Sequence, residues 1–472
     1  MLLRLEGRSL ADRNLAEPMR QLPDRPVSPT MIREWATAPV HGFLAARPSG
    51  TARCSANWMT SRRLALAVAW LLCVMPGCAS EHAGLPASDG SVSATDAGAI
   101  DDGAVPDAAP STARIYTHFN WPLAHASGLD PTITNELVRM INATPSGEVI
   151  HGNFFGLSHP VVAAALNAAY DRGVIMRITL DGSPANRAAA PAISVASHMG
   201  TSAGFCGGTD PTTQSLGCIT SAVAGIAHIK FLTFSRTKAP NGVSYPNVVW
   251  FGSYNAGPTG SGDGDSNSAT SVYNSQVSYD ELTAHQIRMQ HQVHYPSNDY
   301  YDRPAGRGYF YDANAGIEAH LSPESGPNLV FDQLLRITPD TSCVIRVFQA
   351  VVSDSVMPAV QRLIALQNKI GGVRHGCQVF VLATFVGTAA MKALSDAGIE
   401  IRHLTKVHDK LFMIDGKYDG SAVNRKLVFT GSHNWENKSS YGNDELLASV
   451  ENAAQYQLFY AHFLAGWQVG TH

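Results

Sequence analysis

A short pattern of polar residues occurs twice in this chain with nearly the same internal spacing. HIK begins at His228 and is followed by GSYN from Gly252, whereas HDK begins at His408 and is followed by GSHN from Gly431. The offset from the histidine to the glycine is 24 residues in the first copy and 23 in the second. Two multi-residue motifs at matched offsets predict a duplicated structural unit, in which each copy contributes the same set of side chains.

The sequence around each motif alternates strand-like and helix-like segments in the same order. In the first copy, strand-like segments at 113–120, 147–155 and 174–182 alternate with helix-like segments at 131–145 and 159–173. The corresponding segments of the second copy, with one further helix-like segment, are at 316–323, 327–338, 343–352, 357–372, 377–383, 388–398 and 399–404. This alternation predicts an α/β fold with a mainly buried sheet in each copy.

The two copies are expected to form separate domains. A helix-like segment at 278–296 ends the first copy, and the polar stretch 298–308 is interpreted as a linker. We therefore expect one domain at residues 114–300 and a second at residues 301–472.

Two HxK(x)4D-like motifs, each followed by GSxN, resemble the signature of the phospholipase D superfamily. The resemblance covers nearly all of residues 114–472. It implies two tandem α-β-α sandwich domains related by pseudo-twofold symmetry, with one active site between them built from both motifs. It also implies hydrolysis of phosphodiesters, with transfer to an alcohol as a variant of the reaction, and no metal ion or other cofactor.

The residue types in the motifs suit that chemistry. On a strand, positions i and i+2 share a face, so the histidine and lysine of each motif are expected to point the same way, with the residue between them facing the core. A phosphodiester is anionic and gains charge on its oxygens during displacement, which requires cationic and amide donors. The predicted catalytic set is His228, Lys230, Asn255, His408, Lys410 and Asn434.

The resemblance also implies roles for the two histidines. His228, in the first motif, is expected to attack phosphorus and form a covalent phosphohistidine. His408 is expected to protonate the leaving alkoxide and then to activate water, acting as general acid and then as general base. The reverse assignment, with His408 as nucleophile, stays open.

The first copy departs from the family pattern at two positions. Ser235 stands where the second copy has Asp415, and residues 274–276 are matched with 443–445, so that Gln276 stands where the second copy has Glu445. Glu445 is the residue expected to orient an imidazole by accepting its Nδ1–H. The long loop after GSYN accounts for the unequal spacing in this match.

Asp415 is included in the predicted catalytic set because of the motif, but its position favours a structural role. It lies seven residues after His408, an odd offset that places it on the opposite face of a regular strand. Asp415 precedes Gly416, a dipeptide typical of a hairpin turn, and Ser235 is expected to serve similarly.

The N-terminal region predicts export. Met59 begins a segment with the basic pair Arg62 and Arg63 and then 12 apolar residues, whereas about 20 are needed to span a bilayer. The run ends at Cys78 and resembles a bacterial lipobox, so either a lipid-anchored protein of the cell envelope or a secreted one is expected. Residues 59–78 are thus a signal peptide, and residues 1–58 are interpreted as a mis-annotated upstream extension.

Residues 79–113 are interpreted as a disordered acidic tether, because they consist mainly of small and acidic residues and have no aromatic residue. Residues 114–472 hold 24 basic and 27 acidic residues, a net charge of −3. A chain without a basic surplus has no general field to attract nucleic acid, so nucleic acid is not expected as a partner.

The folded part contains four cysteines, and no CxxC pair indicates zinc or redox chemistry. In an oxidising compartment we expect the local pairs Cys206 with Cys218 and Cys343 with Cys377, although three connectivities and four free thiols are alternatives.

Three classes of function follow. The favoured one is an exported, monomeric phospholipase D type hydrolase that removes head groups from phospholipids at a membrane surface. The second is an exported endonuclease, since related phosphodiesterases cut DNA by the same chemistry. The third is a phosphate-binding envelope protein without activity, suggested by Ser235 and Gln276.

Overall fold

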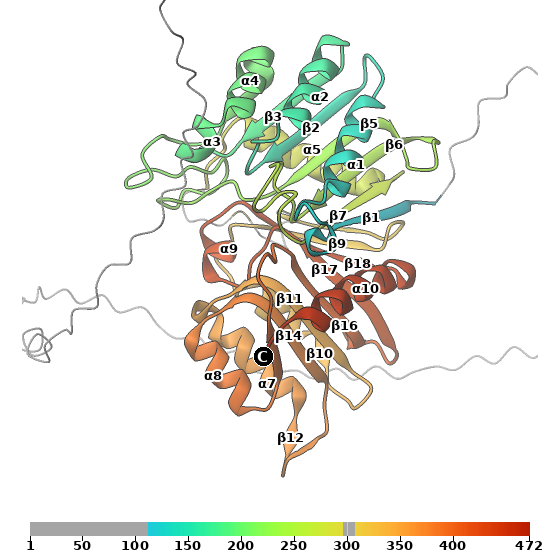
Figure 1. Cartoon of the computed structure of the whole chain (residues 1–472), viewed down its shortest axis with the longest axis vertical. Helices are drawn as coiled ribbons and strands as arrows, with labels where there is room; N and C mark the ends of the chain where they lie inside the picture. Colours follow the sequence, from blue (N-terminus) through green and yellow to red (C-terminus); the bar gives the residue numbers. More distant parts are fainter. Residues whose placement is uncertain (1–111, 296–299, 301–306) are drawn as a thin grey trace, which may run out of the picture. The chain divides into compact units, whose positions relative to one another are not determined.

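The computed structural model describes residues 112–295, 300 and 307–472. The predicted upstream extension, the export signal with Cys78, most of the tether and most of the linker lie outside the described residues. Figure 1 shows the chain, with its two α/β halves in successive colours of the sequence.

The first half is built on a seven-stranded sheet of order β1-β7-β6-β5-β2-β3-β4. Its strands are β1 (Arg114–Asn120), β2 (Val149–Phe154), β3 (Ile175–Leu180), β4 (Ala203–Phe205), β5 (Phe231–Lys238), β6 (Ser244–Gly252) and β7 (Asn267–Tyr273). Strands β2, β3 and β4 pair in parallel, whereas β1, β7, β6, β5 and β2 pair antiparallel in that order.

The second half repeats this order strand for strand as β9-β18-β17-β16-β11-β14-β15, with β8 added beside β9 and β10 beside β16. Its strands are β8 (Tyr309–Asp312), β9 (Ile317–Ser322), β10 (Ile337–Thr338), β11 (Val344–Val352), β14 (Gln378–Val386), β15 (Glu400–His403), β16 (Lys410–Tyr418), β17 (Asn424–Gly431) and β18 (Glu445–Glu451). A separate hairpin joins β12 (Lys369–Ile370) to β13 (Val373–Arg374). The matching orders establish a structural duplication.

Helices cover both faces of each sheet. The helices of the first half are η2 (Pro122–Ala124), α1 (Thr132–Asn142), α2 (Pro160–Asp171), α3 (Pro184–Ala188), α4 (Ala190–Met199), η3 (Gly200–Ser202) and α5 (Gln276–Gln290). Those of the second half are α6 (Leu329–Leu335), η4 (Asp354–Val356), α7 (Met357–Gln367), α8 (Thr388–Asp396), α9 (Asn437–Tyr441) and α10 (Ala453–Val469).

One apolar cluster lies under α1, α2 and α4, and α5 packs on the opposite face of the same sheet (Figure 1). In the second half, α6, α7 and α8 share one cluster, and α10 packs on the other face. The predicted fold class, two tandem α-β-α sandwiches, is confirmed.

Several helix starts follow from local sequence. Pro160 supplies the fixed φ that suits a first helical turn, and the His159 side chain accepts a hydrogen bond from the Val161 amide at 3.2 Å. Asn452 caps α10 by accepting from the amides of Ala454 and Gln455.

The two halves share apolar packing. One cluster combines Leu282 of α5 and Phe251 of β6 with Ile317 of β9 and Leu446 of β18. In addition, Phe119 of the first half packs edge-on against Phe459 of α10, with ring centroids 5.1 Å apart. This shared burial holds the motif-bearing ends of the two sheets against each other.

The sheet topology explains why the motifs converge. Within each half, HxK leads into β5 or β16, with Lys410 as the first residue of β16, and GSxN begins at the last residue of β6 or β17. Because these strands are antiparallel neighbours, the start of one strand and the end of the next lie on the same side of the sheet, where the strands end. The third strand, β7 or β18, begins on that same side.

The structure forms the two disulfides expected from the sequence, Cys206–Cys218 and Cys343–Cys377. Within the described part of the chain, no helix is both long and apolar enough to cross a lipid bilayer.

Candidate active site

The first motif lies in an extended segment that leads into β5. The amide of Ala227 donates to Asp181 Oδ2 at 2.8 Å, and the amide of Ile229 donates to the carbonyl of Asp444 at 2.8 Å. These two bonds fix the backbone on both sides of His228. The predicted pair thus precedes the strand rather than lying within it, and the Lys230 ammonium donates to the His228 carbonyl.

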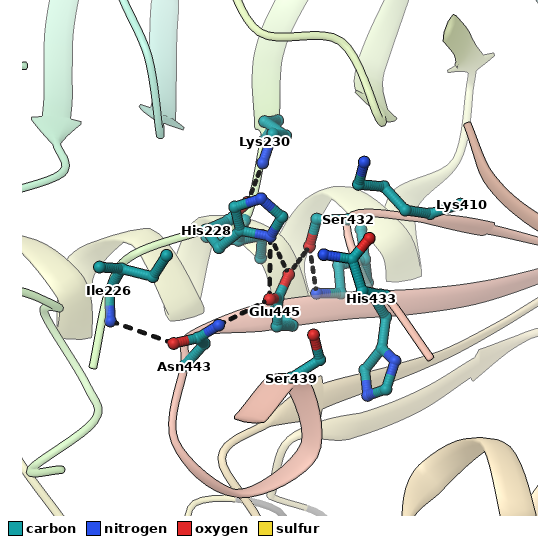
Figure 2. A network of polar contacts seen from close by, with 12 residues as sticks. Ile226, His228, Lys230, Lys410, Ser432, His433, Ser439, Asn443 and Glu445 are labelled. Atoms are coloured by element: carbon teal, nitrogen blue, oxygen red, sulfur yellow. Dashed lines mark hydrogen bonds and ion pairs between the residues drawn. The ribbon is translucent and has the colours of Figure 1, made fainter. Parts of the chain in front are cut away.

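Glu445, the first residue of β18, reaches from the second half to the first histidine. Its carboxylate oxygens lie 2.9 and 2.8 Å from Nδ1 of His228 (Figure 2). The same carboxylate accepts hydrogen bonds from Ser432 Oγ and from Asn443 Nδ2. With Nδ1 engaged, the imidazole presents Nε2 for chemistry.

The second motif has the mirrored arrangement. The amide of His408 donates to the carbonyl of Ser266 at 2.9 Å, and the Lys410 ammonium donates to the His408 carbonyl at 2.7 Å. Nδ1 of His408 lies 2.9 Å from Oδ1 of Asn267, a residue of the first half. Each histidine is therefore oriented by a side chain of the opposite half.

Asn267 corrects one of the sequence predictions. Asn267 is the first residue of β7 and Glu445 is the first residue of β18, and these strands occupy equivalent places in the two sheets. Gln276, which was expected to match Glu445, instead begins α5, where it bonds to Asn247 and Asp280 near the surface. The residue equivalent to Glu445 is thus an amide, but at position 267.

The prediction of a hairpin turn at Asp415 is also wrong. Asp415 lies inside β16, where it pairs with Val344 of β11 and Lys426 of β17, and its carboxylate accepts from the Lys426 ammonium at 2.5 Å. Ser235 lies inside β5, where its hydroxyl donates to Glu148 and accepts from the amide of Val149. Neither side chain joins the histidines, in agreement with a structural role.

Burial and neighbouring cations set the charge states in the site. Burial lowers the pKa of His228 well below its usual value, and the charges of Lys230 and Lys410 lower it further. Burial likewise lowers the pKa of His408, with further lowering by Lys410 and Lys230. Both imidazoles are therefore neutral at neutral pH in the free protein.

The two lysines and the glutamate respond to the same burial. Burial lowers the pKa of Lys410 to about 7, against the opposing effect of Glu445, and lowers the pKa of Lys230 well below its usual range. Burial raises the pKa of Glu445, and Lys230 opposes that rise. Because Lys230, Lys410 and both histidines act on one another across the two halves, all four belong to one electrostatic unit.

The two predicted asparagines lie at the ends of β6 and β17. Asn255 donates to Ser261 Oγ at 2.7 Å, and Asn434 donates to Glu436 Oε1 at 3.2 Å. Among the residues that the structure describes, neither buried Oδ1 atom has a hydrogen-bond partner. Polar atoms of this kind at a site edge are available to a bound substrate.

A cavity of about 210 Å³ adjoins Asn255. Its lining consists of Phe155, Gly156, Leu157, Ser158, Ser183, Ala185, Asn186, Ala189, Asn255, Gly257, Thr259 and Ser261. Phe155 connects it to the site: its ring lies edge-on to the His228 imidazole, 4.7 Å between centroids, and 4.6 Å from the Lys230 ammonium. The Phe155 ring is thus part of both the cavity wall and the surroundings of His228, which does not itself line the cavity.

Sequence reasoning missed three acids that position the site. Asp181 holds the backbone before His228, and Asp444 accepts from the amides of residues 218–220 at 2.6–3.0 Å. Asp409, between His408 and Lys410, is buried and bonded to Ser266 and His462, so the residue between histidine and lysine is not apolar in the second motif. In the described part of the chain, no group of three or more metal-ligating side chains could hold a metal ion.

Comparison with known proteins gives a family match for part of the second half. Residues 348–467 match the family model described as cardiolipin synthase, PLD-like domain. No curated protein sequence matches the chain.

Solved structures are only distantly similar. Polyphosphate kinase from Porphyromonas gingivalis is 10% identical over 75% of this chain and has a TM-score of 0.48, and this chain spans 50% of its length. Phosphatidylserine synthase from Haemophilus influenzae Rd KW20 is 8% identical, covers 75% of this chain and 87% of its own, and has a TM-score of 0.44. The phospholipase D family member Nuc from Salmonella typhimurium is 16% identical over 38% of this chain and 95% of its own, with a TM-score of 0.27. The assignment rests on the family model and on the duplicated motifs.

Two equivalent α/β halves that bring two histidine-lysine pairs to one buried site define a protein of the phosphoryl-transfer class. Residues 348–467, most of the second half, carry a PLD-like domain, the domain of the phospholipase D superfamily.

Proposed function

We propose that the protein is a phosphodiester hydrolase of phospholipase D type, which cleaves head groups from phospholipids through a covalent phosphohistidine. The observation that carries the proposal is the convergence of His228, Lys230, His408 and Lys410 at one buried site, with an orienting side chain on each imidazole.

Each group has a role in this reaction. Nε2 of His228 attacks phosphorus, the bond from phosphorus to the leaving oxygen breaks, and a proton on Nε2 of His408 passes to that oxygen. Water then gives a proton to His408 and its oxygen to phosphorus, and the bond to His228 breaks. An alcohol in place of water gives transfer of the phosphatidyl group. Lys230 and Lys410 offset the negative charge on the phosphoryl oxygens.

The contrast between Glu445 and Asn267 supports His228 as the nucleophile. An imidazole that carries a phosphoryl group on Nε2 and hydrogen on Nδ1 is cationic, and the Glu445 carboxylate stabilises that charge. Asn267 offers His408 a neutral amide, which stabilises a cation less. The reverse assignment would place the covalent intermediate on the histidine without a carboxylate.

A phospholipid is favoured over nucleic acid because residues 114–472 have a net charge of −3. We further propose that the enzyme is exported and meets its lipid in the cell envelope. The two disulfides support an oxidising compartment.

Head-group release from phospholipid vesicles at low salt with EDTA tests this function, with plasmid nicking measured in parallel. The expected result is release by the purified chain and loss of release in His228→Ala and His408→Ala. Nicking without release would identify a nuclease instead, and silence in both assays would count against both activities and favour the class without activity. His198→Ala, which removes an exposed histidine of α4 bonded to Asp171, controls for loss of a histidine as such.

A further inference from the structure

The side-chain amide of Asn267 is locked in one orientation. Its Nδ2 donates, at 3.0–3.1 Å, to three backbone carbonyls of the preceding loop, those of Ser261, Gly262 and Asp265. Its Oδ1 accepts from Ser253 Oγ at 2.9 Å. Turning the amide over would place an oxygen against three carbonyl oxygens, so Oδ1 must be the atom that faces Nδ1 of His408.

This orientation fixes the tautomer of His408. An amide oxygen can only accept, so Nδ1 of His408 carries the hydrogen, and the neutral ring has a bare Nε2. A bare Nε2 has no proton to give to a leaving group. His408 must therefore gain a proton before it can act as a general acid.

Among the described residues, no carboxylate is bonded to the His408 imidazole to hold that proton. The charged and titratable groups that face it are Lys410 on its own strand and Lys230 and His228 from the first half. The Asp409 carboxylate next to it in sequence is bonded to Ser266 and His462. The carboxylates of Glu445, Asp409, Asp265 and Glu436 act on Lys410.

We propose that Asn267 is the positioning residue of His408, and that His408 takes up its catalytic proton only together with the anionic substrate. The negative charge of the bound phosphodiester then takes the place of a protein carboxylate beside the imidazole. One proton from solvent moves to Nε2 on binding, leaves with the alcohol, and is replaced from the attacking water. This inference rests on the proposed function for its catalytic meaning, but its test does not need turnover.

The first test measures proton uptake when sulfate, an anion of fixed charge near neutral pH, binds to the full chain. Calorimetry in buffers of different ionisation enthalpy gives the number of protons, and nitrogen NMR of labelled histidines gives the ring that receives them. We expect close to one proton on His408 per site, with a bare Nε2 on its ring before sulfate and an imidazolium after it. Lys410, with a pKa of about 7, also gains part of a proton near neutral pH, so His408→Gln should lower the uptake by close to one proton and leave the share of Lys410.

The second test uses Asn267→Asp with Gln276→Glu as its matched control. A carboxylate beside His408 should raise the pH at which it titrates by about 1–3 units, so that the sulfate-linked uptake by His408 begins at a higher pH than in the unmodified chain. Gln276→Glu adds the same charge on the exposed start of α5 and should leave the uptake unchanged. Asn267→Asp loses three donated hydrogen bonds, so the fold of this variant is checked by circular dichroism. If the variant does not fold, the NMR measurement of His408 in the unmodified chain tests the inference.

The outcomes separate the inference from the proposed function. A His408 that is already cationic without sulfate, that stays neutral with sulfate, or that carries hydrogen on Nε2 when neutral would overturn the inference. Uptake without head-group release would leave the inference standing and remove the phospholipid substrate. Head-group release without proton uptake by His408 would support the phospholipid substrate and overturn the inference.

Discussion

Nδ1 of His228 lies 2.8 Å from a carboxylate oxygen of Glu445, although the two residues belong to opposite halves of the fold. On the other side of the site, Nδ1 of His408 meets the amide oxygen of Asn267. The duplication therefore produces an asymmetric site, in which the carboxylate and the amide give the two imidazoles different basicity.

The carboxylate contact predicts the effect of Glu445→Gln. The variant keeps the size of the side chain but removes the charge that stabilises a cationic His228, so kcat should fall by about 10²- to 10⁴-fold with little change in thermal midpoint. The fall is measured on vesicles, and trapping of the phosphorylated protein shows whether the first step is affected. Glu451→Gln, at the other end of β18 and paired with Arg425, is the control. Equal kcat in both variants would remove the role assigned to Glu445.

The pH dependence of kcat/KM should reflect the titration of Lys410. With a pKa of about 7, Lys410 is positive below that pH and loses its charge as the pH rises through it. We expect kcat/KM to fall by about 10²-fold on the alkaline side, because a phosphate-binding charge disappears. On the acid side, the low pKa of His228 should keep the nucleophile neutral at pH values below 6.5, the usual histidine pKa.

Lys410→Arg tests this interpretation. Arginine stays protonated to above about pH 12, so the alkaline limb should move upward even if the absolute rate is lower. Lys426→Arg changes a lysine of the neighbouring strand that is paired with Asp415, and it should leave the limb in place. An unmoved limb in Lys410→Arg would assign the alkaline titration to another group.

The fold and the histidine-lysine pairs could be predicted because both follow from repetition, which a single sequence displays. The equivalence of Asn267 and Glu445 could not be read in the same way, because it is set by the first residues of β7 and β18. A signal did exist: Asn267 follows Asn255 by 12 residues, and Glu445 follows Asn434 by 11. The match of residues 274–276 with residues 443–445 hides this agreement in spacing.

The turn expected at Asp415 failed for a different physical reason. Asp-Gly is a common turn signal, but Gly416 stays in the ladder opposite Arg425. A Cβ at Gly416 would lie 2.9 Å from Sγ of Cys343, so the glycine makes room for the disulfide. Such a close approach between distant segments depends on tertiary packing and leaves no local pattern.

The two disulfides should separate activity from stability. Cys218 begins the backbone segment whose amides hold Asp444, the neighbour of Glu445. Cys343 lies next to the end of β11 that pairs with Asp415, far along the strand from the end that pairs with Lys410. Opening Cys206–Cys218 with a double alanine variant should therefore lower kcat by at least about tenfold, because Glu445 loses its fixed place.

Opening Cys343–Cys377 should cost more stability and less activity. Its loop spans 34 residues against 12 for Cys206–Cys218, which corresponds to about 4 and about 3 kcal/mol of unfolding free energy. Urea unfolding and head-group release of the two double variants, measured on the same preparations, check the contrast. A larger activity loss from the 343–377 pair would show that the site does not depend on Asp444.

The cavity beside Asn255 predicts the head group. Its lining contains hydroxyls, amides and small apolar side chains but no charged one, so a buried ammonium or carboxylate of the head group would find no ionic partner there. Phosphatidylglycerol should therefore be cleaved at least about tenfold faster than phosphatidylcholine or phosphatidylserine with the same acyl chains. Ser158→Asp places a carboxylate in the lining and should shift the preference toward choline, whereas Ser194→Asp on the exposed face of α4 should not. Equal rates on all three lipids, unchanged by Ser158→Asp, would show that the head group lies outside this cavity.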